Sequence, residues 1–156
     1  REGGAYEFAA LAPGEYQLQL EGAGARVRMT VDVPLRKNTL RGGERIVQAD
    51  PEGKQALTLF RIKEQFSDSM LVEAELKSGR THQIRVHAAY LGTPVIGDDK
   101  YGDDEINRRY RALGLKRLFL HAWTLAFEWG AEGRVLKLTA PLEPVLEQLL
   151  TTLRKH

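Results

Sequence analysis

The stretch GRTHQIRVH, at positions 79–87, decides how the fold and the site of this chain are interpreted. It holds two arginines, two histidines and a glutamine, with aliphatic residues between them. So many hydrogen-bond donors in so short a segment favour one wall of a ligand site, which the aliphatic residues anchor to the core. Whether the segment is a strand or a helix determines which donors point the same way.

Periodicity alone leaves both structures open for residues 80–92. A strand would place three polar side chains on one face, those of Gln83, Arg85 and His87. A helix would instead align an apolar stripe of Ile84, Ala88 and Leu91. Thr81 is a candidate N-cap, and Gly92 and Pro94 are stop signals. We predict the helix, because its length and its end signals agree.

Outside this segment, alternating polar and apolar residues predict strands in antiparallel pairs. The expected pairs are 15–22 with 26–33, 56–66 with 69–77, and a buried strand at 117–129 with 134–140. A short strand and turn is expected at 94–102. Two further helices are expected at 103–114 and 143–155, the first with acids at its start and arginines later. Antiparallel strand pairs with a few helices place the chain in the α+β class.

The composition indicates the class of protein but does not identify its binding partner. The chain has 156 residues, 42% hydrophobic and 28% charged, which suits one globular domain with a sizeable core. The formal net charge is only +2, so the clustering of basic residues is more informative than their total. With no cysteine there can be no disulfide, thiolate zinc site or cysteine nucleophile, and we expect a cytoplasmic protein. No apolar run is long enough to span a membrane.

A glycine-rich basic stretch at 35–55 is predicted to be a long exposed hairpin or loop. Its basic residues are Arg36, Lys37, Arg41, Arg45 and Lys54. A solvated loop is the ordinary interpretation of such residues, but their grouping favours contact with phosphates. A second candidate basic patch consists of Arg108, Arg109 and Arg111.

Other polar residues have structural interpretations that we prefer. His82 and His87 are five residues apart, which does not suit a metal site on a helix and puts them on opposite faces of a strand. We expect His82 to bond a backbone group or a phosphate, and His87 and His121 to be structural. The acids of GDDKYGDDE, at 97–105, suit turns and a helix start better than paired acid–base carboxylates. The Tyr101 side chain is expected to pack under the ligand-binding cleft that GRTHQIRVH would line.

GRTHQIRVH, PVIGDDKYG at 94–102 and RLFLHA at 117–122 together resemble the RluA-type RNA pseudouridine synthases. The resemblance covers residues 15–156 and leaves 1–14 as an atypical amino-terminal segment. It implies a mixed, largely antiparallel sheet with flanking helices, and RNA held in a central cleft. It also implies a reaction in which an aspartate attacks a uridine nucleotide, and the freed base turns and rejoins the sugar through carbon. No cofactor or metal takes part, and the expected partner of this monomer is large-subunit ribosomal RNA.

The resemblance also assigns roles to individual residues. Arg85 is the arginine that pairs with the catalytic aspartate, and Tyr16 is the tyrosine that stacks on the target base. Leu120 matches the apolar residue that lines the base pocket. The remaining candidate contacts to RNA are Arg80, His82, Gln83, Arg36, Lys37, Arg41 and Arg45.

The chain departs from the family pattern at the nucleophile. The family has an Arg-Leu-Asp segment before the tyrosine strand, whereas this sequence has none, and no aspartate precedes Asp32. We therefore expect the carboxyl-terminal part of a synthase catalytic domain, with little activity on its own. Two alternatives are a non-catalytic RNA-binding module that retains the cleft and a protein-interaction domain unrelated to RNA.

Overall fold

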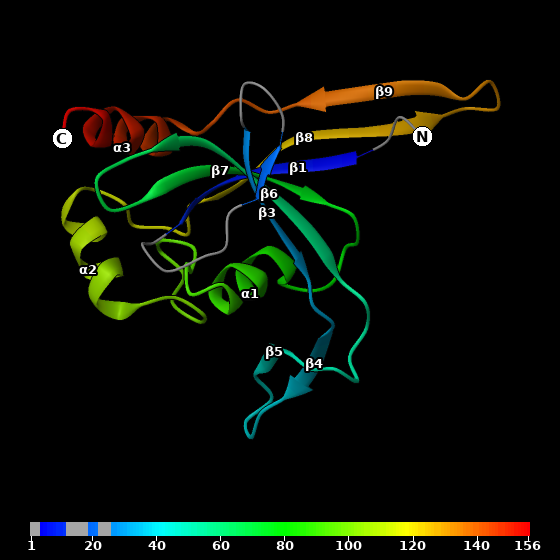
Figure 1. The fold of residues 1–156 in the computed structure, drawn as a ribbon, viewed down its shortest axis with the longest axis horizontal. Coiled ribbons are helices and arrows are strands. Elements are labelled where there is room, and N and C mark those ends of the chain that lie inside the picture. Colours follow the sequence, from blue (N-terminus) through cyan, green and yellow to red (C-terminus); the bar gives the residue numbers. More distant parts are fainter. Residues whose placement is uncertain (1–3, 12–18, 22–25) are drawn as a thin grey trace.

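A computed structural model describes residues 4–11, 19–21 and 26–156 of the chain. Most strands form one seven-stranded sheet in the order β2-β3-β6-β7-β1-β8-β9, and β4 and β5 form a separate two-stranded sheet (Figure 1). Every described strand pair is antiparallel, and helices flank the sheet, so the predicted α+β class is confirmed. The elements are β1 (Gly4–Leu11), β2 (Gln19–Glu21), β3 (Arg26–Asp32), β4 (Leu35–Thr39), β5 (Arg45–Ala49), β6 (Leu57–Gln65), β7 (Met70–Leu76), α1 (Gln83–Tyr90), α2 (Asp104–Ala112), β8 (Leu120–Trp129), β9 (Arg134–Thr139) and α3 (Pro144–Arg154).

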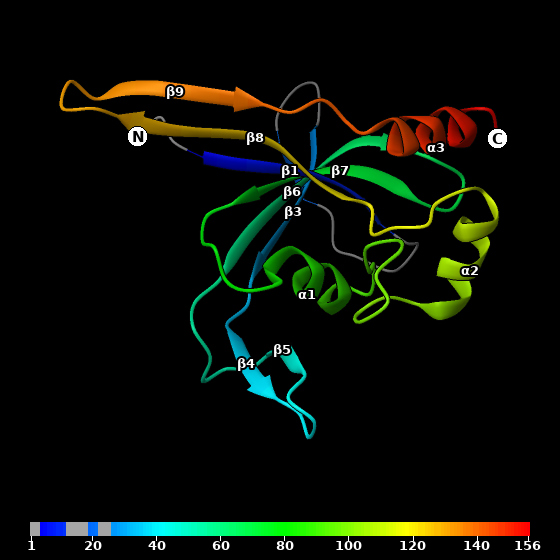
Figure 2. The same ribbon diagram turned by 180° about the vertical axis from the view of Figure 1, so that it is seen from behind.

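Helices cover both faces of the large sheet, α1 on one and α3 on the other (Figures 1 and 2). The strand alternation explains this arrangement, because successive side chains point to opposite faces. On β1, Ala9 and Leu11 pack in the cluster that contains Ile84 of α1. Ala10 packs in the other cluster, which includes Leu146 of α3.

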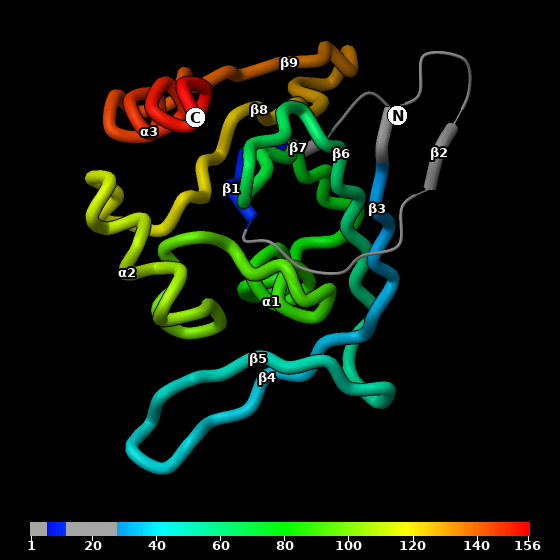
Figure 3. Tube along the Cα trace, turned by 60° about the vertical axis from the view of Figure 1, so that its left-hand side comes forward, coloured from blue at the N-terminus to red at the C-terminus, as the bar shows by residue number. Residues whose placement is uncertain are grey.

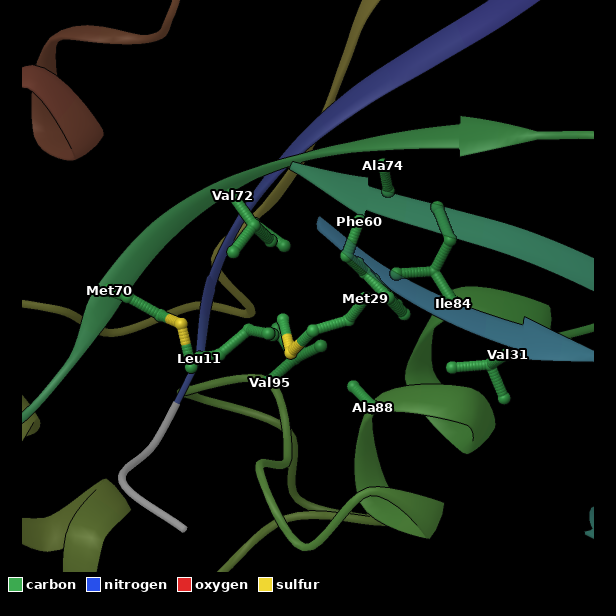
Figure 4. Packing of buried hydrophobic residues seen from close by; sticks show 11 residues of the cluster. Leu11, Met29, Val31, Phe60, Met70, Val72, Ala74, Ile84, Ala88 and Val95 are labelled. Carbon is green, nitrogen blue, oxygen red and sulfur yellow. The ribbon is translucent and has the colours of Figure 1, made fainter. Parts of the chain in front are cut away.

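The buried hydrophobic cluster under α1 is the larger of the two clusters that flank the sheet. Its fully buried members include Phe60, Val72 and Leu11, with Met29 filling the space toward Val95 (Figure 4). Burying one such side chain stabilises the fold by about 1.5–3 kcal/mol. This packing fixes α1 against the sheet, and with it the polar side chains at the helix start.

The first described strand, β1, lies inside the sheet and not at its edge. β1 pairs with β7 on one side and with β8 on the other, and a β-bulge interrupts its pairing with β8 between Tyr6 and Glu7. Residues 4–11 therefore join the two halves of the sheet, although the sequence motifs set 1–14 apart. Only Gln19–Glu21 of the predicted strand at 15–22 lie within the described residues.

The predicted pairs β6–β7 and β8–β9 are confirmed, as are all three helices. The proposed cap at Thr81 was wrong, because the N-cap of α1 is His82 and no side chain caps it. Gly92, with φ of 78°, does follow the end of α1, as its stop signal predicted. Residues 94–102 form turns with a single bridge from Val95 to Leu11 rather than a strand, because two aspartate-rich turns follow at once.

Two hairpins extend from the body of the molecule. The pairing of β4 with β5 confirms a hairpin within 35–55, and this hairpin runs past α1 on the side away from the sheet (Figure 3). β8 and β9 form an arm that continues beyond the other strands (Figure 1). The expectation of a buried strand was wrong for β8, because Thr124 is its one buried residue and the far end of the arm exposes Leu125 and Trp129.

Candidate functional site

Two cavities meet at the turn between β7 and α1, and Gly79 and Arg80 line both of them. The first cavity, of about 510 Å³, lies between this turn and the β4–β5 hairpin, and we call it the hairpin cavity. The second, of about 440 Å³, lies over the sheet beside the start of α1, and we call it the cleft. The residues that line the cleft are Glu7, Leu76, Gly79, Arg80, His82, Gln83, Ile84, Arg85, Leu118 and Leu120.

Gln83 holds the turn between β7 and α1 in place. Its side-chain oxygen accepts hydrogen bonds from the Ser78 hydroxyl and the Arg80 backbone N–H, at 2.8 and 2.9 Å. Its side-chain nitrogen donates to the Leu57 carbonyl and to the Thr58 hydroxyl. These four bonds use the full capacity of the amide, so Gln83 is suited to positioning its neighbours. Its predicted contact with substrate stays a prediction.

His82 adopts a strained backbone conformation at the mouth of the cleft. It is the one residue other than glycine with a positive φ, 53°, in the part of the chain that the structure describes. Such a conformation costs on the order of 1–3 kcal/mol and persists only where neighbouring contacts enforce it. One such contact is a 2.8 Å hydrogen bond between the His82 Nδ1 and the Tyr101 hydroxyl.

The Tyr101 hydroxyl also links the cleft to the β4–β5 hairpin. It accepts a 3.0 Å hydrogen bond from the backbone N–H of Val47, in β5. The arrangement is satisfied when Tyr101 donates to Nδ1 of His82, which leaves the imidazole proton on Nε2. Burial lowers the pKa of His82, and the nearby charges of Arg85 and Lys100 lower it further. The ring is therefore neutral at pH 7 and offers one donor.

Arg85 and Asp98 form the strongest charge pair of the site. The guanidinium donates from Nε and Nη2 to the two carboxylate oxygens, both at 2.8 Å. The Asp98 side chain is fully buried and that of Arg85 is 17% exposed. Burial alone would raise the pKa of Asp98, but the bonds from Arg85 and from two backbone N–H groups outweigh it and hold the pKa low.

This pair refines two interpretations of the sequence. Asp98 does accept backbone N–H groups in a turn, as the turn interpretation predicted, but it is also the carboxylate partner of Arg85. Arg85 has five N–H donors, of which Asp98 takes two. The remaining donors and the position of Arg85 on the cleft wall leave it able to bind a second anion.

Glu7 is the cleft residue that the sequence patterns missed. It lies on β1, with Ala74 and Ala122 as its cross-strand neighbours. Burial raises the pKa of Glu7, and the positive potential of His121 opposes this in part. The only sequence signal was the alternation of Tyr6, Glu7 and Phe8, which suits a strand but identifies no ligand.

The charged residues that line the hairpin cavity are mostly basic. They are Arg36, Lys37, Lys54 and Arg80, with Glu52 as the one acid. Arg36 is partly neutralised, because it pairs with Asp50 at 3.2 Å and with Glu52 at 3.3 Å. Arg80 donates from Nε to the Gln55 carbonyl.

The remaining predicted residues lie in several places. Leu120 lines the cleft, whereas Arg41 and Arg45 are exposed near the hairpin tip, away from both cavities. Tyr16 lies outside the described residues. The expected partner of the His82 ring was a backbone group or a phosphate, and the structure gives the Tyr101 hydroxyl instead.

His87 and His121 are structural, as predicted. His87 bonds the Thr58 hydroxyl and the Val33 carbonyl, and His121 bonds the Ala140 carbonyl. Three or more possible metal ligands do not gather anywhere among the described residues. Within the same part of the chain, no helix combines the length and the apolar character needed to cross a membrane.

Comparison with known proteins agrees with the motifs. The family described as RNA pseudouridylate synthase matches residues 25–90. Ribosomal large subunit pseudouridine synthase C from Pasteurella multocida is 42% identical over 96% of the chain, and that from Escherichia coli is 40% identical over 95%. The chain spans 44% of the length of these curated relatives.

Solved structures support the fold. Human RNA Pseudouridylate Synthase Domain Containing 1 matches 99% of the chain and 67% of its own, with a TM-score of 0.69 and 22% identity. Human RNA Pseudouridylate Synthase Domain Containing 4 matches 97% of the chain and 62% of its own, with a TM-score of 0.68 and 23% identity. Over the part that it spans, the chain is therefore similar in sequence to the RNA pseudouridylate synthase family, and its fold is that of the solved pseudouridylate synthase domains.

Proposed function

We propose that this chain forms the RNA-binding wall of an enzyme that converts uridine to pseudouridine in large-subunit ribosomal RNA. The observation that carries the proposal is the juxtaposition of the cleft, with Arg80, His82, Arg85 and Leu120 on its wall, and the basic hairpin cavity. An apolar cleft wall suits a base turned out of its stack, and the adjoining cations suit the phosphates beside it. The names of the relatives support ribosomal RNA as the target.

In this proposal different residues contact the base and the reacting aspartate. The side chains of Leu118 and Leu120 pack against the base. Arg85, which is already fixed by Asp98, presents its remaining N–H groups to an anion in the cleft. That anion is the carboxylate of the reacting aspartate, which must stay ionised to attack the nucleotide. The proposed setting is a cytoplasmic monomer that needs no cofactor or metal.

RNA affinity and its dependence on salt test the proposal. With two or three phosphate contacts, binding of a single-stranded ribosomal RNA fragment should weaken roughly tenfold between about 50 and 200 mM salt. Changing Arg36, Lys37, Arg41 and Arg45 to Ala together should flatten that dependence. The charge-matched control changes four exposed cations elsewhere, namely Lys116, Arg134, Lys137 and Lys155.

Equal slopes for the two quadruple variants would remove the hairpin from the proposed site. Absence of salt-dependent RNA binding by the unchanged chain would refute the proposed function. The catalytic part of the proposal requires a protein that contains an aspartate nucleophile. In that protein, release of tritium from [5-³H]uridine in ribosomal RNA should fall when Arg85 is changed to Met.

A further inference from the structure

Glu7 occupies an unusual position for an acid in a site that would bind RNA. It lies on β1, an interior strand of the sheet, and lines the same cleft as Arg80, His82 and Arg85. A carboxylate at this place repels phosphates and is costly to bury, so a purely structural role gives no reason for it. No side-chain hydrogen bond or ion pair of Glu7 occurs among the described residues.

The local structure directs Glu7 into the cavity. Its neighbours on β7 and β8 are Ala74 and Ala122, whose short side chains leave the space above the strand open. The register of β1 against β8 shifts between Tyr6 and Glu7, but the extra residue, Trp123, lies on β8, so the side chains of β1 keep their alternation. On the same face, Ala9 and Leu11 enter the core under α1, so Glu7 stands where that core ends and the cleft begins.

The residues around Glu7 restrict what it can bind. Leu76, Leu118 and Leu120 form apolar walls, and none of them donates a side-chain hydrogen bond. A carboxylate accepts hydrogen bonds only, so its partner must bring N–H or O–H groups into a largely apolar space. A uridine within an RNA chain carries such groups as the imide N–H of its base and the 2′-hydroxyl of its ribose.

We propose that Glu7 contacts the target nucleotide directly by accepting a hydrogen bond from an N–H or O–H group of the uridine in the cleft. This inference rests on the proposed function and adds a specificity-determining residue to it. Burial raises the pKa of Glu7, so ionising this carboxylate in the cleft has a cost, and a hydrogen bond from a donor would lower that cost.

The test compares RNA affinity for Glu7→Gln and Glu7→Met with that for Glu128→Gln and Glu128→Met. Glu128 is an exposed glutamate on β8, away from the cleft, so each pair of variants removes the same charge. If Glu7 were a bystander, removing its charge would tighten binding of RNA, as it should at Glu128. If Glu7 instead accepts a hydrogen bond from the RNA, removing its carboxylate should weaken RNA binding. Glu7→Met should then bind a short RNA with one central uridine about tenfold more weakly than Glu128→Met does.

Modified RNAs identify the donor. N3-methyluridine removes the imide N–H, and 2′-deoxyuridine removes one ribose hydroxyl. At least one of these changes should weaken binding to the unchanged chain and have little further effect on Glu7→Met, whose contact is already lost. Within each variant, the affinity for the modified RNA is divided by the affinity for the unmodified RNA. A general loss of protein stability lowers both affinities and leaves this ratio unchanged.

Two results would overturn the inference in different ways. If the Glu7 variants bind the RNA as tightly as the Glu128 variants, or more tightly, Glu7 does not contact the nucleotide, while salt-dependent binding leaves the proposed function standing. If the unchanged chain binds no RNA, the proposed function fails and the role of Glu7 fails with it.

Discussion

Replacing Arg85 by Met should strongly destabilise the protein at neutral pH. The change leaves the fully buried Asp98 carboxylate without its charged partner, and only backbone N–H groups remain to bond it. Breaking a buried ion pair from one side costs about 3–5 kcal/mol, and the retained backbone bonds favour the lower end, about 3 kcal/mol. With a denaturant dependence of about 2 kcal/mol per molar urea, the unfolding midpoint should fall by about 1.5 M.

The destabilisation should also depend on pH. In the unchanged protein the pKa of Asp98 is lower than in the unfolded chain. The ionised Asp98 therefore contributes its full stabilisation of the fold above the unfolded-state pKa of about 3.9, and this stabilisation is lost only at lower pH. Without Arg85, burial raises the pKa of Asp98, and protonation relieves the unpaired charge as the pH falls. The difference in unfolding free energy between variant and wild type should therefore shrink from pH 7 to about pH 4.5.

Urea unfolding, followed by circular dichroism at both pH values, measures this difference. Arg109→Met is the matched control, because Arg109 forms an exposed pair with Asp68 and should cost less than about 1 kcal/mol at either pH. A cost for Arg85→Met below about 1 kcal/mol, or one that is the same at both pH values, would refute the reasoning.

Three further changes test other parts of the structure. Tyr101→Phe removes the hydroxyl that accepts the Val47 N–H, so it should cost about 1–2 kcal/mol and speed hydrogen exchange at the Val47 amide. Gly97→Ala should lower the free energy of unfolding by about 3 kcal/mol or more in thermal unfolding, because φ is +85° and the new Cβ would overlap the Arg117 backbone carbonyl. Gly79→Ala is its control, because a Cβ there meets nothing within 4 Å. Glu7→Gln should stabilise the fold at pH 7, because ionised Glu7 is costly above its raised pKa, and this gain should vanish near pH 4, where wild-type Glu7 is protonated.

The sequence predicted the local elements well, because their signals are local. The start of α2 has an acid that caps it, with the Asp103 side chain accepting from the Ile106 N–H. Gly92 ends α1, as its position after the apolar stripe suggested. The cap at Thr81 failed because the turn before α1 is held by contacts from outside the helix, including the bond from His82 to Tyr101.

The arrangement of the site was less predictable, because its contacts join distant segments. Short-range turn chemistry explained Asp98 only in part, since its charged partner lies on the helix that precedes it. Glu7 was overlooked because nothing near it in sequence resembles a site. Its place depends on the pairing of β1 with two strands that lie far along the chain.

The position of β1 inside the sheet, between β7 and β8, has a consequence for how the protein is made. A ribosome adds about 5–20 residues per second, so β8, which begins roughly a hundred residues after β1, emerges on the order of ten seconds later. During that time β1 can pair with β7 at most, and its other edge stays open to any unpaired strand nearby. Newly synthesised chains should therefore be most prone to aggregation just before β8 emerges, and a chaperone that shields strand edges would act at that stage.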